Sequence, residues 1–264
     1  MAAGLALAAV VLAPYAVMVF TALKPAGELR ATPPRLLPIE WRPDNFVDVL
    51  RDAGFQTWLR ASLIVAVTST VLVLLAAVPA AYYTARRRFR GRTTFLFLVL
   101  VTQMFAPTAL VVGLYREFFE LGLVNTYAAL ILTNAAFNLA FAIWILRAFF
   151  ASIPKEIEEA AAIDGCRPLG ALLRVVLPLS GPGLVSAAIF AFIAAWNEYI
   201  VALTLMTDAA KKPLTVGITT YVTAYVQHWN ALFAASVIAI VPVVILFALI
   251  ERYLVGGLTA GSVK

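Results

Sequence analysis

The sequence of 264 residues contains few of the side chains on which enzymes and metalloproteins depend. It has one cysteine, Cys166, and one histidine, His228. A single cysteine cannot form a disulfide within the chain, and no Cys/His cluster has the spacing of metal ligands. An intramembrane enzyme would need paired catalytic or metal-binding groups, for which the sequence offers little material. We therefore expect no catalytic residue, no metal site and no cofactor held by this chain.

Charged residues are also scarce. They make up 13% of the chain, against 63% hydrophobic residues, and the mean hydropathy is +0.93. Soluble domains carry about 25% charged residues, so this composition predicts a membrane protein. Helices are favoured over a β-barrel because the apolar runs are long and do not alternate in short segments. The net charge of +6 indicates basic cytoplasmic loops rather than nucleic-acid binding.

A membrane-spanning helix needs about 20 mostly apolar residues. The stretches that qualify are residues 2–23, 63–83, 94–114, 127–149, 181–206 and 232–255. Pro107 lies inside the third stretch and is expected to kink or break it. Because no boundary to a soluble domain is visible, the whole of 1–264 is predicted to be one all-α transmembrane domain with six spans.

The orientation follows from an arginine-rich loop between the second and third spans. Residues 86–92 contain five arginines and no acidic residue, which predicts a cytoplasmic loop. With six spans, both termini are then cytoplasmic. The proline-rich segment 24–60 would lie outside, as an extended strap that ends in a short helix near Asn45–Asp52.

The segment 152–178, between the fourth and fifth spans, would lie on the cytoplasmic side. Ser152 and Pro154 suit a helix start, and Gly165 and Pro168 would end that helix. Small residues at Ala160 and Ala161 would let another surface approach the backbone closely. The residues alone leave two interpretations open, a docking knob and a solvated connector helix.

This segment resembles the EAA loop of ABC importer permeases. The matching positions are Glu159-Ala160-Ala161, Gly165, Val175 and Leu177-Pro178. Further segments are similar to the carbohydrate-uptake branch, the maltose-type inner-membrane permeases. These segments are Leu121–Thr126, Trp196–Tyr199 and Gly257–Lys264. The resemblance covers essentially the whole chain.

The resemblance implies the six-helix type I ABC importer permease fold, N-in and C-in, in a bacterial or archaeal cytoplasmic membrane. It implies import of a sugar or related polar solute by alternating access. The implied partners are a second permease, two ATPase subunits that bind ATP and Mg, an extracytoplasmic solute-binding protein and membrane lipid. The chain lacks the G-x-x-x-x-G-K-[ST] phosphate loop, so a partner would hydrolyse the ATP.

The resemblance also assigns residues to the ATPase contact. In related importers the EAA loop forms a coupling helix that sits in a cleft of the ATPase subunit, and the C-terminal tail reaches the same interface. The residues implied in the coupling contact are Glu158, Glu159, Ala160, Ala161, Asp164 and Gly165. The residues implied in the tail contact are Gly261 and Lys264.

Several polar residues lie within the predicted spans. Trp196, Asn197 and Glu198 would either line or gate the translocation path or make a structural contact, because a carboxylate inside a span is costly. Sugar binding and hydrogen bonds to neighbouring helices explain the other amides equally well. These amides belong to Gln103, Asn134 and Asn138.

A loop after the fifth predicted span carries polar and charged residues. Asp208, Lys211 and Lys212 lie in a loop whose position matches a family loop that probes the binding protein, although an ordinary polar turn would look the same.

An ion-coupled secondary transporter working alone would need broken midplane helices and several buried acids, and only Glu198 fits. Trehalose, maltose-like sugars and glycerophosphodiesters all remain open as solutes.

Overall fold

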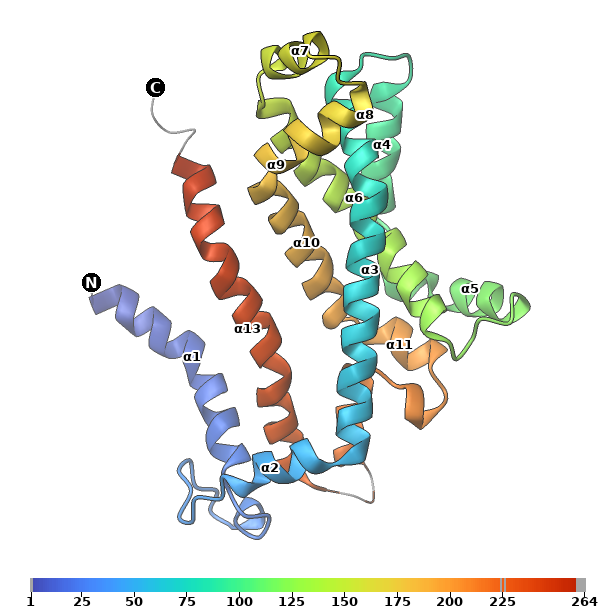
Figure 1. Ribbon diagram of the computed structural model, residues 1–264. Coiled ribbons are helices and arrows are strands. Elements are labelled where there is room, and N and C mark those ends of the chain that lie inside the picture. Colours follow the sequence, from blue (N-terminus) through green and yellow to red (C-terminus); the bar gives the residue numbers. More distant parts are fainter. Residues whose placement is uncertain (1, 224, 226, 260–264) are drawn as a thin grey trace. The chain divides into compact units, whose positions relative to one another are not determined.

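The computed structural model describes residues 2–223, 225 and 227–259 of the chain, which form helices joined by short loops (Figure 1). In chain order the elements are α1 (Ala2–Ala22), η1 (Glu28–Arg30), α2 (Asp44–Arg51), α3 (Ala53–Arg86), α4 (Arg92–Thr102), α5 (Pro107–Glu120), α6 (Tyr127–Ser152), α7 (Lys155–Ile163), α8 (Pro168–Ala171), the π-helical turn η2 (Leu172–Val176), α9 (Leu177–Leu179), α10 (Gly181–Trp196), α11 (Ile200–Leu205), η3 (Ala209–Lys211), α12 (Leu214–Gly217), η4 (Ile218–Tyr221) and α13 (Trp229–Thr259).

The chain forms two compact units. Unit 1 consists of Met1–Ser62 and Asp208–Ile245, and unit 2 consists of Leu63–Thr207 and Leu246–Lys264. Both α3 and α13 contribute residues to each unit. The single permease domain expected from the sequence therefore stays a prediction.

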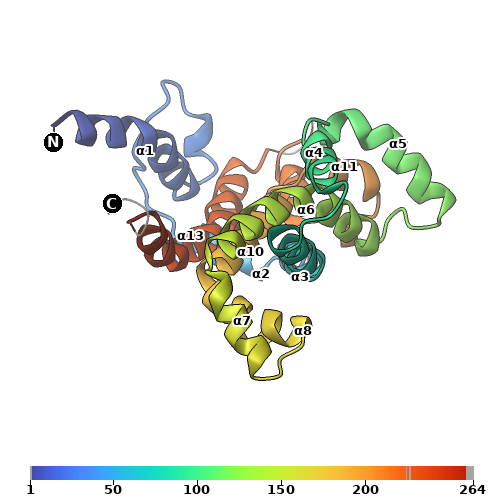
Figure 2. The same ribbon diagram turned by 90° about the horizontal axis from the view of Figure 1, so that it is seen from above.

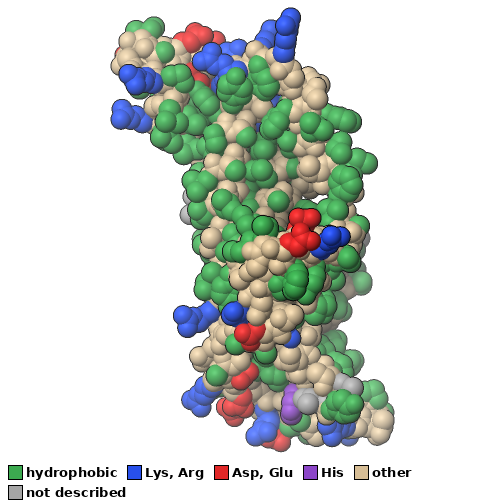
Figure 3. Space-filling model, turned by 90° about the vertical axis from the view of Figure 1, so that its right-hand side faces the viewer, with side chains coloured by type: hydrophobic (Ala, Val, Ile, Leu, Met, Phe, Trp, Pro, Cys, Tyr) green, Lys and Arg blue, Asp and Glu red, His purple; other side chains and the backbone are tan. Residues whose placement is uncertain are grey.

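Four helices, α1, α3, α6 and α13, are long and apolar enough to cross a membrane. Two bent helix pairs raise the number of candidate spans in the described residues to as many as six. The predicted helical membrane protein is thus confirmed, with four to six candidate spans. On the face drawn in Figure 3, hydrophobic side chains occupy much of the surface between groups of charged side chains.

The span predicted across residues 94–114 is not one continuous helix. Helix α4 ends at Thr102, α5 begins at Pro107, and their axes differ by 94°. Pro107 occupies the first turn of α5, where its missing N–H has no intrahelical partner to lose. Of the two expected outcomes, the structure shows the break, and a new helix starts at the proline.

The span predicted across residues 181–206 is likewise not one continuous helix. Helix α10 ends at Trp196, and α11 begins only at Ile200. At its other end, α10 meets the segment Pro168–Leu179 at a bend of 82°. Glu198, expected inside a helix, lies in the break between α10 and α11.

The core of unit 2 lies between α6 and α10, which run next to each other in Figures 1 and 2. Small residues permit this close packing. A Cβ placed on Gly183 of α10 would lie 2.4 Å from Cγ of Phe149 on α6. The buried Phe150 and Leu146 extend the core along α6, and Val73 joins it from α3.

In unit 1, the segment 208–221 is fixed onto the start of α3. The Tyr221 hydroxyl donates to the Asp52 carboxylate at 2.7 Å, and the indole of Trp58 donates to the Ala209 carbonyl at 3.2 Å. Burial and the hydrogen bond to Asp52 both raise the pKa of Tyr221. Gly217 packs directly on Trp58, because a Cβ there would lie 2.2 Å from the ring. The segment 208–221 is therefore held as part of unit 1.

Candidate functional site

The loop at residues 152–178 begins with α7, and the C-terminus of α7 shows why Gly165 occurs there. Gly165 has a φ of +84°, a conformation that glycine adopts without strain. The Cys166 N–H donates to the Ala161 carbonyl at 2.9 Å, and the Gly165 N–H donates to the Ala162 carbonyl at 3.0 Å. This bonding is the Schellman motif, which satisfies the last carbonyls of a helix. It turns the chain sharply into α8.

The second helix of this loop, which begins at Pro168, is irregular. Helix α8 gives way to the π-helical turn η2, and the bend into α10 follows at Ser180. The Ser180 hydroxyl is buried and has no hydrogen-bond partner in the described part of the chain. π-Helical turns often occur at functional sites, and this one connects the loop to α10.

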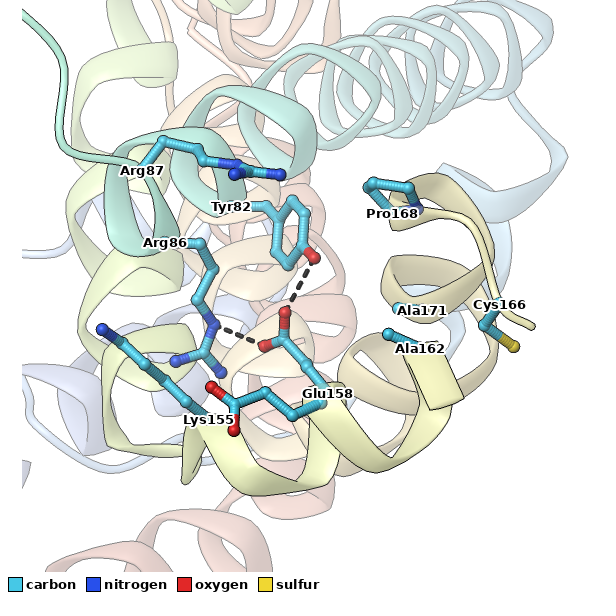
Figure 4. A pocket seen from close by; sticks show the side chains of 10 residues that line it. Tyr82, Arg86, Arg87, Lys155, Glu158, Ala162, Cys166, Pro168 and Ala171 are labelled. Carbon is cyan, nitrogen blue, oxygen red and sulfur yellow. Dashed lines mark hydrogen bonds and ion pairs between the residues drawn. The ribbon is translucent and has the colours of Figure 1, made fainter. Parts of the chain in front are cut away.

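Glu158, expected on the docking face of α7, points instead toward α3 (Figure 4). Its carboxylate accepts a hydrogen bond of 2.8 Å from the Tyr82 hydroxyl and forms an ion pair with Arg86. Arg86 also donates to the Ile153 carbonyl at 3.0 Å. The side chains of Arg86 and Glu158 are only 9% and 15% exposed. We call Tyr82, Arg86 and Glu158 the α7 latch, because they join α7 to the end of α3.

A pocket of about 260 Å³ lies beside the α7 latch, between the end of α3 and the loop (Figure 4). Arg87 and Lys155 bring positive charge to its wall, and Glu159 brings negative charge. Because the charges are mixed, the pocket does not select a ligand of one sign.

The outer surface of the loop carries most of the predicted contact residues. Glu159, Ala160, Asp164 and Gly165 are exposed, whereas Ala161 is buried. Ile163 is 88% exposed on the same helix. This isoleucine was not among the predicted contact residues, although its i,i+4 spacing from Glu159 places both on one helix face. Tyr82 and Arg86 were not predicted either, and the loop itself contains no signal for them.

The three amides in the spans have protein partners for their N–H groups. Asn134 donates to the Leu130 carbonyl at 2.9 Å, and Asn138 donates to the Asn134 carbonyl at 2.8 Å, both within α6. Gln103 donates to the Phe137 carbonyl at 2.8 Å and so links the end of α4 to α6. Hydrogen bonds within the chain therefore account for one N–H group of each amide.

Glu198 lies just before α11 and binds the N–H groups of its first turn. The Val201 and Ala202 N–H groups donate to its two carboxylate oxygens at 2.7 and 2.8 Å. A carboxylate at this position also suits the positive end of the helix dipole. Of its predicted companions, Trp196 is buried and stacks on Phe192 at 5.6 Å, while Asn197 is exposed. Helix capping by Glu198 therefore offsets the cost of placing a carboxylate there.

The outer-loop residues lie at the surface of unit 1. Asp208 accepts a hydrogen bond of 2.9 Å from the Ala210 N–H at the start of η3. Lys211 is exposed and Lys212 is half-buried. Farther along the chain, Tyr225 is 97% exposed, and it was not predicted as a contact residue. The predicted tail residues Gly261 and Lys264 lie outside the described residues.

Among the described residues, no group of three or more His, Cys, Asp or Glu side chains is placed to hold a metal ion.

Comparison with known proteins gives a consistent result. The profile of the family described as "Binding-protein-dependent transport system inner membrane component" matches residues 77–259. The chain is 37% identical to the inner membrane ABC transporter permease protein YcjP of Escherichia coli, over 99% of this chain and 94% of that protein. It is 39% identical to the trehalose/maltose transport system permease protein MalG of Thermococcus litoralis, over 84% of this chain and 81% of that protein.

A solved structure supports the same relationship. A chain of a bacterial ABC transporter involved in the import of the acidic polysaccharide alginate superposes with a TM-score of 0.81. The two chains are 26% identical, and the match covers 94% of this chain and 92% of that one.

Proposed function

The chain belongs to the family of binding-protein-dependent transport system inner membrane components. We therefore infer that its loop at residues 152–178 contacts an ATPase subunit and transmits the movement of that subunit to the membrane helices. The chain is a permease subunit of an ABC importer, and it is non-catalytic, since separate subunits hydrolyse ATP in this family. ATP and Mg would be bound by two such ATPase subunits. A second permease and a solute-binding protein outside the membrane would complete the assembly.

A carbohydrate is the proposed cargo. The relative from Thermococcus litoralis is named for trehalose and maltose, and the structural neighbour imports alginate. Our proposal therefore extends to sugars and related polar solutes as a class. The ion-coupled alternative is not supported, because the relatives named above are permeases of ABC transporters.

The proposed topology has six spans, with both termini in the cytoplasm of a bacterium or archaeon. In this arrangement each bent pair, α4 with α5 and α8–α9 with α10, counts as one crossing. The contact between Arg86 and Glu158 supports the orientation. It brings the arginine-rich loop and α7 to the same end of unit 2, and positive charge favours the cytoplasm.

The proposed docking surface consists of Glu159, Ala160, Ile163, Asp164 and Gly165. The observation that carries it is the exposure of an isoleucine beside small residues on a helix that the α7 latch holds. An apolar side chain that is 88% exposed on a cytoplasmic loop suits an apolar pocket of a partner. Glu158 has a different role in this proposal, because it orients α7 from within the chain.

Substitution of Ile163 tests the docking surface. In I163D, the amount of ATPase that co-purifies with the tagged permease is expected to fall several-fold, because a charge would enter an apolar contact. The matched control is I157D, on the same helix, where the native side chain is 39% exposed and lies outside the proposed surface. Equal recovery of ATPase with both variants would show that α7 docks through another face.

The proposed translocation path runs along the two helix breaks. Helix α11 packs against α5, and near their C-terminal ends the Asn125 N–H donates to the Leu205 carbonyl at 2.9 Å. Non-helical backbone at membrane depth is tolerated where it is buried in protein or lines an aqueous cavity. Trp196, Asn197 and Glu198 at one break, and Gln103 at the other, are the residues we assign to this path. Asn134 and Asn138 of α6 are the remaining candidates.

Substitution of Glu198 tests this assignment. In E198A, α11 would lose a cap worth about 1 kcal/mol, and uptake is expected to fall several-fold while the complex still assembles. E198Q is the matched variant, because its amide oxygen keeps one acceptor and should preserve more uptake. Uptake by radiolabelled solute and assembly by size exclusion are the two measurements. Full transport by a stable E198A complex would remove Glu198 from the path.

The proposed contact with the solute-binding protein includes Asp208, Lys211 and Lys212. Tyr225 is added because its ring is almost fully exposed, and an exposed aromatic side chain suits an interface.

A further inference from the structure

The strap, residues 24–43 of unit 1, returns to the end of α1 from which it starts. The Arg42 N–H donates to the Leu23 carbonyl at 2.8 Å. The Trp41 ring packs edge-on against Phe20, in the last turn of α1, with ring centroids 6.2 Å apart and planes at 88°. Trp41 therefore lies at the level where the candidate span α1 ends.

Polar contacts hold the strap in a defined shape. The ammonium group of Lys24, which is buried, donates to the Arg35 carbonyl. The Glu28 carboxylate accepts a hydrogen bond of 3.0 Å from the Ile39 N–H. Asn45, at the start of α2, donates to the Ala22 carbonyl at 2.8 Å. Because these bonds already order the backbone, contact with another surface would require little further ordering.

The strap displays a set of large apolar side chains to its surroundings. Leu36 is 72% exposed, Leu37 is 58% exposed, Ile39 is 67% exposed and Trp41 is 56% exposed. Arginine side chains flank this set. Arg30 and Arg35 are exposed, and neither forms an ion pair with another described residue. Apolar residues with a tryptophan and neighbouring cations are typical of the boundary between hydrocarbon and lipid headgroups.

We propose that the strap is a membrane-interface anchor whose occupant is the lipid leaflet at which α1 ends. The apolar surface is continuous with α1, whose Leu12 and Tyr15 are 60% and 53% exposed and suit contact with lipid tails. Leu36, Leu37 and Ile39 insert among the headgroups, and Arg30 and Arg35 reach the lipid phosphates. The anchor fixes the end of α1. It goes beyond the proposed function and requires neither the carbohydrate cargo nor a particular orientation.

Spin-label accessibility in the assembled complex tests the anchor. The complex is placed in nanodiscs of phosphatidylethanolamine and phosphatidylglycerol, and a nitroxide is attached to L37C in a C166S background. L12C provides the lipid-embedded reference, and Y225C, measured without the solute-binding protein, provides the aqueous reference. At position 37, the ratio of oxygen to nickel-chelate accessibility is expected to lie between the two references, within the headgroup region. A second label at I39C repeats the measurement if L37C fails to assemble.

Three results would overturn the anchor. An oxygen-to-nickel accessibility ratio at position 37 equal to that of Y225C would place the strap in water. Protection from both oxygen and the nickel chelate would show that a protein partner, such as the second permease, covers it. A water-exposed label that becomes protected only when the solute-binding protein is added would assign the strap to that partner. Lipid contact is measured without transport, so a failed anchor is distinguishable from a failed transport assignment.

Discussion

Replacing Arg86 with alanine is expected to lower solute uptake at least about tenfold while leaving the chain in the membrane. Removing one partner of a buried ion pair costs about 3–5 kcal/mol, because the other charge stays buried without its partner. Here the carboxylate of Glu158 would keep only the Tyr82 hydroxyl. We expect α7 to separate from α3, so that movement of the ATPase no longer reaches the spans. The measurement is uptake beside solute-stimulated ATPase activity in the same reconstituted complex.

Three variants make this prediction specific to the α7 latch. R88A removes an exposed arginine just beyond α3 and should leave uptake near the wild-type level. E158Q should lose activity as R86A does. The exchanged pair R86E with E158R should recover part of the loss, because the ion pair can form in the opposite sense. Wild-type uptake by R86A would mean that α7 needs no attachment to α3.

Enlarging Gly183 is expected to have the largest effect on stability. A Cβ at this position would lie 2.4 Å from Cγ of Phe149 and 2.8 Å from its Cβ. Overpacking of a core typically costs about 1–3 kcal/mol, which is the expectation for G183A. G183L should prevent α6 and α10 from packing and leave little folded protein. Thermal unfolding in detergent, followed by fluorescence-detected size exclusion, gives both results.

A second substitution and a matched glycine control this prediction. F149A added to G183A should recover part of the lost stability, since it removes the ring atoms but leaves the Phe149 Cβ in place. Gly113 lies inside α5, and a Cβ added there would meet no atom within 4 Å, so G113A should be neutral or slightly stabilising. If G183A were as stable as wild type, α6 and α10 would have to move apart with no loss of stability, which would contradict this prediction.

Long apolar runs determined the helical membrane class from sequence alone. In lipid, backbone groups must be satisfied within a segment, so about 20 apolar residues already imply a helix. Four predicted spans accordingly correspond to α1, α3, α6 and α13. The third and fifth did not follow this rule. Hydropathy averages over a window, and therefore registers neither the break before Pro107 nor the one around Glu198.

The candidate site likewise has one part that the sequence predicts and one part that only the tertiary structure decides. Gly165 was predictable, because a residue that ends a helix in the left-handed conformation is usually glycine, and this is a local property. The inward direction of Glu158 was decided by tertiary structure, since its partners Tyr82 and Arg86 are more than 70 positions away in the sequence. A loop sequence contains the acidic residues but not the helix against which it packs.

The small number of charged residues explains why the sequence predicts the helical class but not the partners of the charged side chains. With 13% charged residues, most of this chain has one way to satisfy its backbone in a membrane, and the sequence by itself determines that it forms helices. The few charged side chains can pair in several ways, and a pair forms only where folding brings its members within a few ångströms. Only the tertiary structure therefore decided that Glu158 joins Arg86 and that Glu198 caps α11.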